Sequence, residues 1–304
     1  MDERAERILY LGPEGTFTHT AAIDLAPANA VLEPAAEAWL VIRAVDSGEC
    51  DGGVVAFENS LDGTVGANID KLLHEANRCL IAGERVLAVS FDLYRRRGDS
   101  SELQRLLGHP VALAQSSRLL EQRSLEGVPA ASNVAALADL AALSEPGVGA
   151  LGPPGLAERF SLRVEAEHVE DSPAATRFVL LRKSSPRPTG RDLSAFVVRP
   201  AREEAGSLVS ILQQFSTRGI NLAAIKSRPT RTAVGDYLFY LECEGHLLDE
   251  PVHRAVLGLI RGTAGVRYLG SFPADPARQF AAPSQPDLEA DREYEAMLGD
   301  VDAQ

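Results

Sequence analysis

Residues 53–60 read Gly-Val-Val-Ala-Phe-Glu-Asn-Ser, a short apolar strand that ends in three polar side chains. Similar short apolar stretches recur between residues 7 and 182, separated by helical stretches such as 65–75 that place apolar side chains on one face. This alternation predicts an α/β fold with a largely parallel sheet. The predicted strands are 8–11, 53–57, 85–94, 111–114, 149–151 and 176–182.

A different pattern follows residues 184–191, a stretch with two prolines and no apolar periodicity that we interpret as a linker. Residues 192–273 show the order βαββαβ, which is that of the ferredoxin-like split βαβ arrangement. Its predicted elements are 193–198, 206–216, 220–226, 237–243, 252–260 and 266–269. Residues 274–304 lose this periodicity and are rich in acids, so we expect a disordered tail without an assignable function.

The composition limits the possible partners of the chain. Its 304 residues carry a formal net charge of −13, and an acidic surface repels nucleic acid and anionic membranes. We find no secretory signal and no apolar stretch long enough to span a bilayer. Cys50, Cys79 and Cys243 have neither disulfide nor metal-ligand spacing, which favours a reducing cytoplasm. An anionic substrate therefore has to be held by local donors and one or two placed cations.

The first candidate binding segment is Gly12-Pro13-Glu14-Gly15-Thr16-Phe17, between a predicted strand and a predicted helix. A glycine-rich turn exposes backbone N–H groups at a helix N-terminus, where the helix dipole also favours an anion. Thr16 adds a hydroxyl donor. The glycine spacing fits neither a dinucleotide fingerprint nor a P-loop. A tight turn with a helix cap explains the same residues without a ligand.

Polar side chains follow or open three other predicted strands. Asn59 and Ser60 come at the carboxyl end of a strand, the edge where open α/β sheets bind ligands, although Ser60 also fits a helix cap. Gln115 follows the predicted strand 111–114. Thr176-Arg177-Phe178 opens a strand, and the planar guanidinium of Arg177 suits a carboxylate. A structural ion pair with a nearby acid is the alternative for Arg177.

Together these segments resemble the prephenate dehydratase family in order and spacing, over nearly all of residues 7–273. In the first part of the chain, the matching motifs are Gly12–Phe17, Glu58-Asn59-Ser60, His109-Pro110 with Ala112–Gln115, and Thr176-Arg177-Phe178. In the second part, Gly206-Ser207-Leu208-Val209 resembles the Gly-Ala-Leu-Val motif of ACT domains, and Lys226-Ser227-Arg228-Pro229 resembles Glu-Ser-Arg-Pro.

The resemblance implies an α/β two-lobed catalytic domain over 7–183, like a type II periplasmic binding protein, with a second lobe at about 91–170. A ferredoxin-like βαββαβ ACT regulatory domain over 192–273 would follow it. The implied activity is that of a cytoplasmic carbon–oxygen lyase of L-phenylalanine biosynthesis, which converts prephenate to phenylpyruvate, CO2 and water. Aromatisation drives this reaction, so no cofactor or metal is required. The enzyme has to orient a dianion and assist the departing hydroxide.

Residue roles follow from the same resemblance. Thr176 is expected to donate to the leaving hydroxyl, Arg177 to bind a substrate carboxylate, and Phe178 to pack against the ring. Glu58 is expected to orient its neighbours, because a carboxylate that faces a dianion opposes binding. The remaining predicted substrate-binding residues are Thr16, Asn59, Ser60 and Gln115.

The resemblance also implies an allosteric phenylalanine site between paired ACT domains of a homodimer or homotetramer. Two residues depart from the ACT motifs: Ser207 replaces Ala, and Lys226 replaces Glu, a charge reversal that leaves the sign and strength of feedback open. The predicted effector-binding residues are Gly206, Ser207, Leu208, Val209, Asn221, Leu222 and Ser227.

Three other functions stay open on sequence grounds. One is decarboxylation of prephenate without loss of the hydroxyl, which should dispense with the acid that expels water. A second is dehydration of arogenate, whose side chain carries an amine in place of the keto group. The third is a non-catalytic amino-acid sensor, since fold likeness alone does not fix function.

Overall fold

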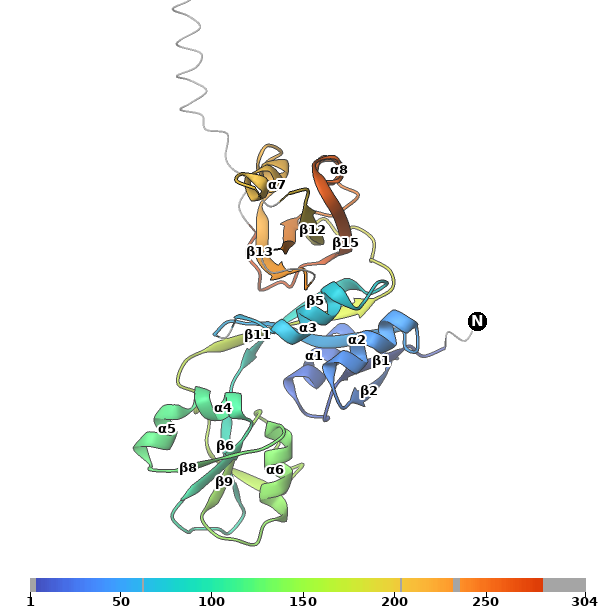
Figure 1. The fold of residues 1–304 in the computed structure, drawn as a ribbon. Coiled ribbons are helices and arrows are strands. Elements are labelled where there is room, and N and C mark those ends of the chain that lie inside the picture. Colours follow the sequence, from blue (N-terminus) through green and yellow to red (C-terminus); the bar gives the residue numbers. More distant parts are fainter. Residues whose placement is uncertain (1–3, 62, 203, 232–235, 281–304) are drawn as a thin grey trace, which may run out of the picture.

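The computed structural model describes residues 4–61, 63–202, 204–231 and 236–280. Within these ranges, three sheets follow one another along the molecule, each with helices on at least one face (Figure 1). None of the helices in this part of the chain is both long and apolar enough to cross a membrane. Most of the predicted acidic tail, residues 281–304, lies outside the described ranges.

The first sheet has the strand order β2-β1-β3-β11-β5, with β4 paired to β3. Strand β11 runs antiparallel to both of its neighbours, whereas β1 pairs in parallel with β2 and β3. The sheet is therefore mixed and not largely parallel, because β11 returns from a distant part of the chain and inserts between β3 and β5. The strands are β1 (Arg7–Leu11), β2 (Val31–Ala35), β3 (Gly52–Asn59), β4 (Gly63–Thr64), β5 (Leu80–Val89) and β11 (Ala174–Arg182).

Helices cover both faces of this sheet. Ala21 and Ala22 of α1 (Phe17–Leu25) pack on Ile8, Tyr10 and Val54 on one face. The apolar sides of α2 (Ala38–Ser47) and α3 (Gly66–His74) pack on the other face. The predicted helix at 65–75 is thus confirmed as α3.

The second sheet has the order β10-β6-β9-β7-β8 and contains residues between the two halves of the first sheet. The predicted strand 85–94 is therefore two strands, since the chain passes from the first sheet to the second between β5 and β6. The mixed α/β sheets fit a fold like that of the periplasmic binding proteins. The elements are β6 (Asp92–Arg96), β7 (Arg105–Gly108), α4 (Pro110–Gln115), α5 (Ser117–Gln122), β8 (Glu126–Pro129), α6 (Asn133–Ala142), β9 (Val148–Gly152) and β10 (Leu162–Ala166).

The prediction of a strand at 111–114 was wrong, since these residues form helix α4. The strand of this region is β7, six residues earlier in the chain. The ring nitrogen Nδ1 of His109 accepts a hydrogen bond of 3.3 Å from the backbone N–H of Val111, and Pro110 occupies the start of the helix, where its missing N–H costs nothing. Four apolar residues fit a buried strand and a short helix equally well, so only the preceding His-Pro pair signals the helix.

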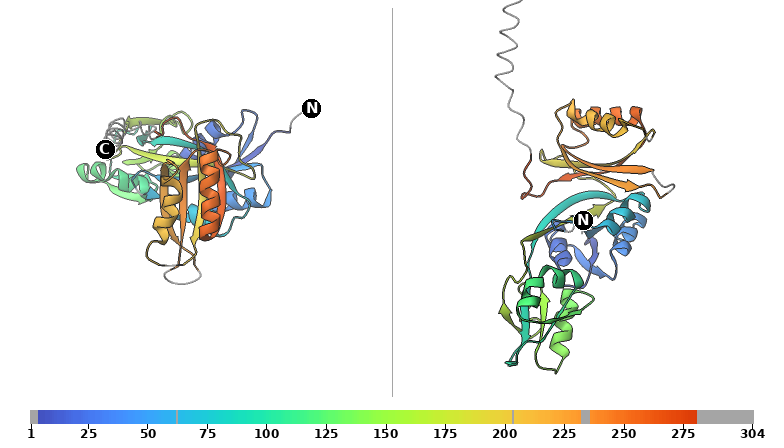
Figure 2. Two further views of the ribbon diagram at one scale, coloured as in Figure 1. Left: turned by 90° about the horizontal axis from the view of Figure 1, so that it is seen from above. Right: turned by 60° about the vertical axis from the view of Figure 1, so that its left-hand side comes forward.

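The third sheet has the order β13-β14-β12-β15 and follows the predicted βαββαβ chain order. Phe196 and Val198 face the helices, while Ala195 and Val197 face the first sheet. Figure 2 shows the two helices side by side on the outer face. The elements are β12 (Asp192–Pro200), α7 (Ser207–Ser216), β13 (Leu222–Pro229), β14 (Tyr237–Glu244), α8 (Glu250–Gly262) and β15 (Thr263–Pro273).

The third sheet shares its hydrophobic core with the first. Tyr240 and Phe272 belong to the same buried cluster as Phe57 and Ile81. Backbones approach closely at Gly270, which has φ +123°, and a Cβ atom there would lie 2.1 Å from the carbonyl oxygen of Ile81. Only glycine fits this position. The C-terminal sheet is therefore packed against the first sheet, although the connecting residues 183–191 contain neither helix nor strand.

Residues 274–280 correct the predicted start of the disordered tail. Asp275 is only 2% exposed, and its backbone N–H donates to Glu84 at 2.9 Å. Arg278 pairs with the same carboxylate at 2.8 Å. The acidic composition of the tail concealed this contact, because composition reports the average environment of a segment and not the burial of one side chain.

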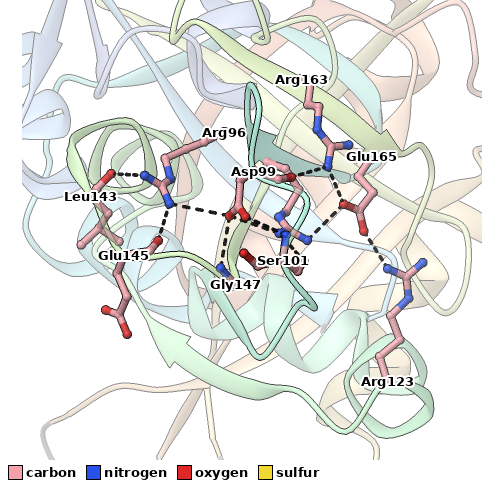
Figure 3. Close-up of polar contacts among 10 residues, drawn as sticks. Arg96, Asp99, Ser101, Arg123, Leu143, Glu145, Gly147, Arg163 and Glu165 are labelled. Carbon is pink, nitrogen blue, oxygen red and sulfur yellow. Dashed lines mark hydrogen bonds and ion pairs between the residues drawn. The ribbon is translucent and has the colours of Figure 1, made fainter.

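Figure 3 shows a group of charged side chains from the second lobe, among them Asp99 and Glu165 with Arg96, Arg123 and Arg163. The Asp99 carboxylate accepts hydrogen bonds from the backbone N–H groups of Ser101 and Gly147, and it pairs with Arg95 at 3.2 Å. Its side chain is 6% exposed. Burial alone would raise the pKa of Asp99, but the Ser101, Arg95 and Gly147 donors outweigh it and hold the pKa well below its ordinary range.

We predict that Asp99→Asn lowers the free energy of unfolding at pH 7 by roughly 2–4 kcal/mol, because it removes a buried charge with several donors. A depressed pKa stabilises the fold above the ordinary aspartate value and less below it, so the difference from wild type should shrink between about pH 4 and pH 3. Urea unfolding at several pH values measures both effects. Asp139→Asn, an exposed carboxylate on α6, is the control, and a constant difference across this range would contradict the prediction.

Candidate active site

A cleft of about 860 Å³ lies between the first two sheets. Its walls come from distant parts of the chain: the turn between β1 and α1, the ends of β3 and β5, β4, α4, the start of α6, and β11. These segments meet because β11 carries the chain back from the second sheet into the first. Each of the four polar segments that the sequence singles out contributes at least one residue to the cleft wall.

The starts of helices α1, α3 and α6 line this cleft, as does that of the short helix α4. Thr16 caps α1 by accepting from the backbone N–H of His19 at 3.3 Å, and Ser132 caps α6 by accepting from that of Ala135 at 3.0 Å. Helix α3 begins directly after Val65, which also lines the cleft. Helix N-termini carry partial positive charge and unpaired N–H groups. The cleft is therefore suited to an anionic ligand.

Among the described residues that line the cleft there is no lysine or arginine. Glu14 is the one acidic side chain of this set, and it is exposed and pairs with Arg159 at 3.2 Å. An anion in the cleft is consequently held by backbone N–H, hydroxyl, amide and imidazole groups. These groups are the local donors that we expected, but the one or two placed cations that we also expected are not among the described residues that line the cleft.

Thr176 and Asn59 form a hydrogen-bonded pair in the cleft wall. The amide nitrogen Nδ2 of Asn59 donates to the hydroxyl oxygen of Thr176 at 3.0 Å, and the amide oxygen Oδ1 accepts from the backbone N–H of Leu61 at 2.8 Å. The second bond fixes which way the amide faces. Because the Thr176 oxygen accepts from Asn59, its own proton remains available to a group in the cleft.

Phe178 lies beyond Thr176 in the same wall. Its ring is 2% exposed and packs with Tyr10 and Ala22, while part of it still faces the cleft. Phe17 and Phe91 meet edge to face at 6.0 Å between ring centroids and add an apolar surface. The cleft thus combines a polar edge with apolar walls, as expected for a small ring-containing acid.

Arg177 and Ser60 are not in the cleft, contrary to prediction. Successive side chains of a strand point to opposite faces, so Arg177 points away from the side that carries Thr176 and Phe178. It is 4% exposed and is bound to Glu84 at 2.5 Å and Glu242 at 2.8 Å. The hydroxyl of Ser60 accepts from the backbone N–H of Ala175 at 2.9 Å and joins β3 to β11. The structural ion pair weighed for Arg177 describes its contacts, whereas Ser60 bonds to a strand and does not cap a helix.

Thr16 and Gln115 line the cleft as predicted, although the Thr16 hydroxyl is engaged by its cap and by the carbonyl of Pro13 at 3.0 Å. His109 and Asn133 also line the cleft and were not among the predicted site residues. Burial lowers the pKa of His109, which keeps the ring neutral near pH 7. Since Nδ1 accepts from Val111, the neutral ring carries its proton on Nε2. In the sequence, the signal for His109 was its position directly before Pro110, the residue that starts helix α4.

Of the predicted effector residues, 206–209 lie at the start of α7, Asn221 and Leu222 follow its far end, and Ser227 lies within β13. Gly206 caps the start of the helix with φ +94°, and Val209 in its first turn is 55% exposed. Asn221 follows the far end and donates to Glu244 at 2.8 Å. A helix of 10 residues spans about 15 Å, so one small amino acid does not reach both groups within a single chain.

Three comparisons with known proteins indicate the family of the chain. The family model for prephenate dehydratase matches residues 8–186. The prephenate dehydratase of Mycolicibacterium smegmatis is 41% identical over 288 residues, which cover 89% of this chain and 91% of that protein. A crystal structure of prephenate dehydratase from Arthrobacter aurescens in complex with L-Phe has a TM-score of 0.81 and 31% identity, covering 98% of this chain and 100% of that one.

A further solved structure is GqqA, described as a novel type of quorum quenching acylase. It has a TM-score of 0.79 and 26% identity and covers 90% of this chain and 100% of that one. The family match and the 41% identical relative span most of the part of the chain that builds the cleft. The chain belongs to the prephenate dehydratase family.

Proposed function

We propose that this chain converts prephenate to phenylpyruvate, CO2 and water in the cleft between the first two sheets. The hydrogen-bonded pair of Asn59 and Thr176, in a wall without cationic side chains among the described residues, supports this proposal most directly. The pair offers one oriented proton donor to a leaving hydroxyl. Family membership supplies the substrate class.

The reaction in this cleft begins with loss of the ring carboxylate. The electrons of the breaking C–CO2 bond move into the ring, complete its aromatic system and expel the hydroxyl on the opposite ring carbon. Thr176 donates its proton to that oxygen, so that water leaves. The N–H of Asn59 then stabilises the charge that develops on the threonine oxygen, which regains a proton from solvent. No electron acceptor is needed, because the reaction is redox-neutral.

The substrate is a dianion, and its two carboxylates are held by the helix starts. The N-termini of α1, α3 and α6 face the cleft, and the Nε2–H of His109 is an additional donor. Such donors bind the carboxylates without moving a charged side chain into the apolar walls. Exclusion of water from the walls strengthens each of these contacts. Arg177 has no direct part in this binding.

We also propose that residues 192–273 form an ACT regulatory region attached by 184–191 to a catalytic region of residues 7–183, in a cytoplasmic homo-oligomer. The L-Phe in the Arthrobacter aurescens structure supports L-phenylalanine as the effector. Gly206 and Asn221, at the two ends of α7, contact the same effector molecule only if two chains pair and each chain supplies one of these residues. Lys226, which replaces the glutamate of the motif, pairs with Glu58 at 2.8 Å. The charge reversal therefore affects the ion pair between the third sheet and the first sheet.

We predict that Thr176→Ala lowers kcat for phenylpyruvate formation by about 10²- to 10⁴-fold, the contribution of a positioned general acid. KM should change little, since the helix starts that bind the carboxylates stay in place. Purified protein with prephenate near neutral pH and detection of phenylpyruvate provide the measurement. Thr20→Ala, at an exposed threonine on α1 that does not line the cleft, is the matched control.

The same assay separates the competing functions. CO2 release without phenylpyruvate would indicate decarboxylation alone, and turnover of arogenate but not prephenate would indicate the amine substrate. Inertness to both, with hydrolysis of an N-acyl substrate, would point to the acylase activity reported for GqqA. A wild-type rate that Thr176→Ala leaves unchanged would contradict the role given to Thr176.

For the regulatory region, we predict that L-phenylalanine in the millimolar range raises the melting temperature of the wild-type chain and that Val209→Asp abolishes the shift. An aspartate at this position, once covered by the second chain of the proposed pair, would oppose both the apolar contact and the ligand carboxylate. Thermal melts and calorimetric titration measure the effect. Ile260→Asp is the matched control, because Ile260 is 58% exposed on the neighbouring helix α8. Equal shifts in both variants would contradict the predicted site.

A further inference from the structure

The strands that present Thr176 and Asn59 to the cleft present their neighbours to the C-terminal sheet. In the pairing of β11 with β3, Thr176 lies opposite Asn59, and Arg177 lies opposite Glu58. Because side chains alternate along a strand, the first pair faces the cleft while the second faces the opposite side. The proposed proton donor Thr176 is therefore directly next to Arg177, which contacts the C-terminal sheet, along the backbone of β11.

Arg177 is held by acids from two different sheets. Its Nε lies 2.5 Å from Glu84 of β5 in the first sheet, and its Nη2 lies 2.8 Å from Glu242 of β14 in the third. The side chains of both acids have no exposed surface. Arg278 also pairs with Glu84, so two cations balance two anions in this buried group. Such buried charges hold each other in place, since a displaced partner would be left without compensation.

A second ion pair connects the same two sheets. Lys226 of β13 lies 2.8 Å from Glu58, the residue before Asn59. Thr176 is thus followed by Arg177, and Asn59 is preceded by Glu58. Both of these neighbours pair with a charged residue of the C-terminal sheet. The guanidinium of Arg177 also lies 5.2 Å from the centroid of the Phe57 ring, which contacts Tyr240 at 5.6 Å.

The backbone ladder is irregular where these contacts occur. The register between β11 and β3 shifts between Arg177 and Phe178, so that Phe57 is an extra residue on β3. A bulge interrupts the regular hydrogen bonds and re-aims the side chains next to it. The hydrogen bonds of the sheet alone therefore leave the relative position of Thr176 and Asn59 less constrained than in a regular ladder.

We propose that Arg177 is a positioning residue, anchored by Glu242 and Glu84, that holds β11 so that Thr176 stays in hydrogen-bonding position with Asn59. Glu242 is part of the C-terminal sheet, so this sheet fixes the geometry of the proton donor directly. Lys226 does the same for Asn59 through Glu58. The proposal rests on the proposed function, since it assigns the position of Thr176 a consequence for turnover.

The test is a double-mutant cycle on kcat with Glu242→Gln and Thr176→Ala in the full-length chain. Glu242→Gln keeps the shape of the side chain and removes its charge. We expect it to lower kcat for prephenate about 10- to 100-fold with KM within about threefold, the effect of a small misplacement of a reacting group. In the Thr176→Ala background, the same change should alter kcat by less than about twofold, because the group it positions is gone.

Asp99→Asn is the matched control, because it disrupts a buried charge group at the far end of the second lobe. It should destabilise the chain and leave kcat within about twofold of wild type, at a temperature where all variants are folded. If Glu242→Gln does not fold, Lys226→Gln takes its place, since that side chain is 14% exposed and the variant removes the parallel pair with Glu58. The expected decrease in kcat is then about three- to tenfold, again absent in the Thr176→Ala background.

Two results would overturn the proposal: a decrease in kcat that persists in the Thr176→Ala background, or an equal decrease in Asp99→Asn. A wild-type chain that forms no phenylpyruvate would refute the proposed function instead. Amide hydrogen exchange then decides the positioning role by itself. Faster exchange of residues 174–178 in the Glu242 variant, but not in Asp99→Asn, supports the role of Arg177, and unchanged exchange there refutes it.

Discussion

The antiparallel insertion of β11 between β3 and β5 is the constraint on which the rest of the structure depends. It closes the first sheet with a strand that comes from beyond the second sheet, so the two lobes face each other across a cleft. The same pairing sets Thr176 opposite Asn59. Both the position of the cleft and the contact between its two central polar side chains thus follow from one strand register, and a shift by one residue would turn Thr176 away from the cleft.

The described residues that line the cleft include no cationic side chain and one exposed acid, Glu14. In the cleft, uncharged donors and helix starts meet the ligand, whereas the guanidinium of Arg177 is neutralised by two acids on the other side of the same strand. A fixed set of dipoles costs no reorganisation during the reaction, while a mobile cation in an apolar wall would have to be desolvated. Burial raises the pKa of Cys79 to about 12, so this thiol also stays neutral inside the shared core.

The C-terminal sheet is part of the same packed body as the catalytic lobes. It shares a core with the first sheet, its β15 backbone touches β5 at Gly270, and its charged residues contact those next to the cleft pair. A ligand bound at the outer helices is therefore only two layers away from Thr176. Coupling between such sites needs an element with two arrangements that both sites influence, and β11 with its buried ion pairs is the structural element that joins them.

The sequence by itself determined the alternation of strands and helices, the βαββαβ order, the family and most polar segments of the cleft, because strand and helix periods and short motifs are local properties. It misassigned 111–114 as a strand, since four apolar residues fit either element. Only the tertiary structure decided which face of β11 carries Arg177, how Ser60 is used, and that Asp275 is buried. These outcomes depend on strand register and on partners such as Glu84 and Glu242, which are distant in the chain and leave no local pattern.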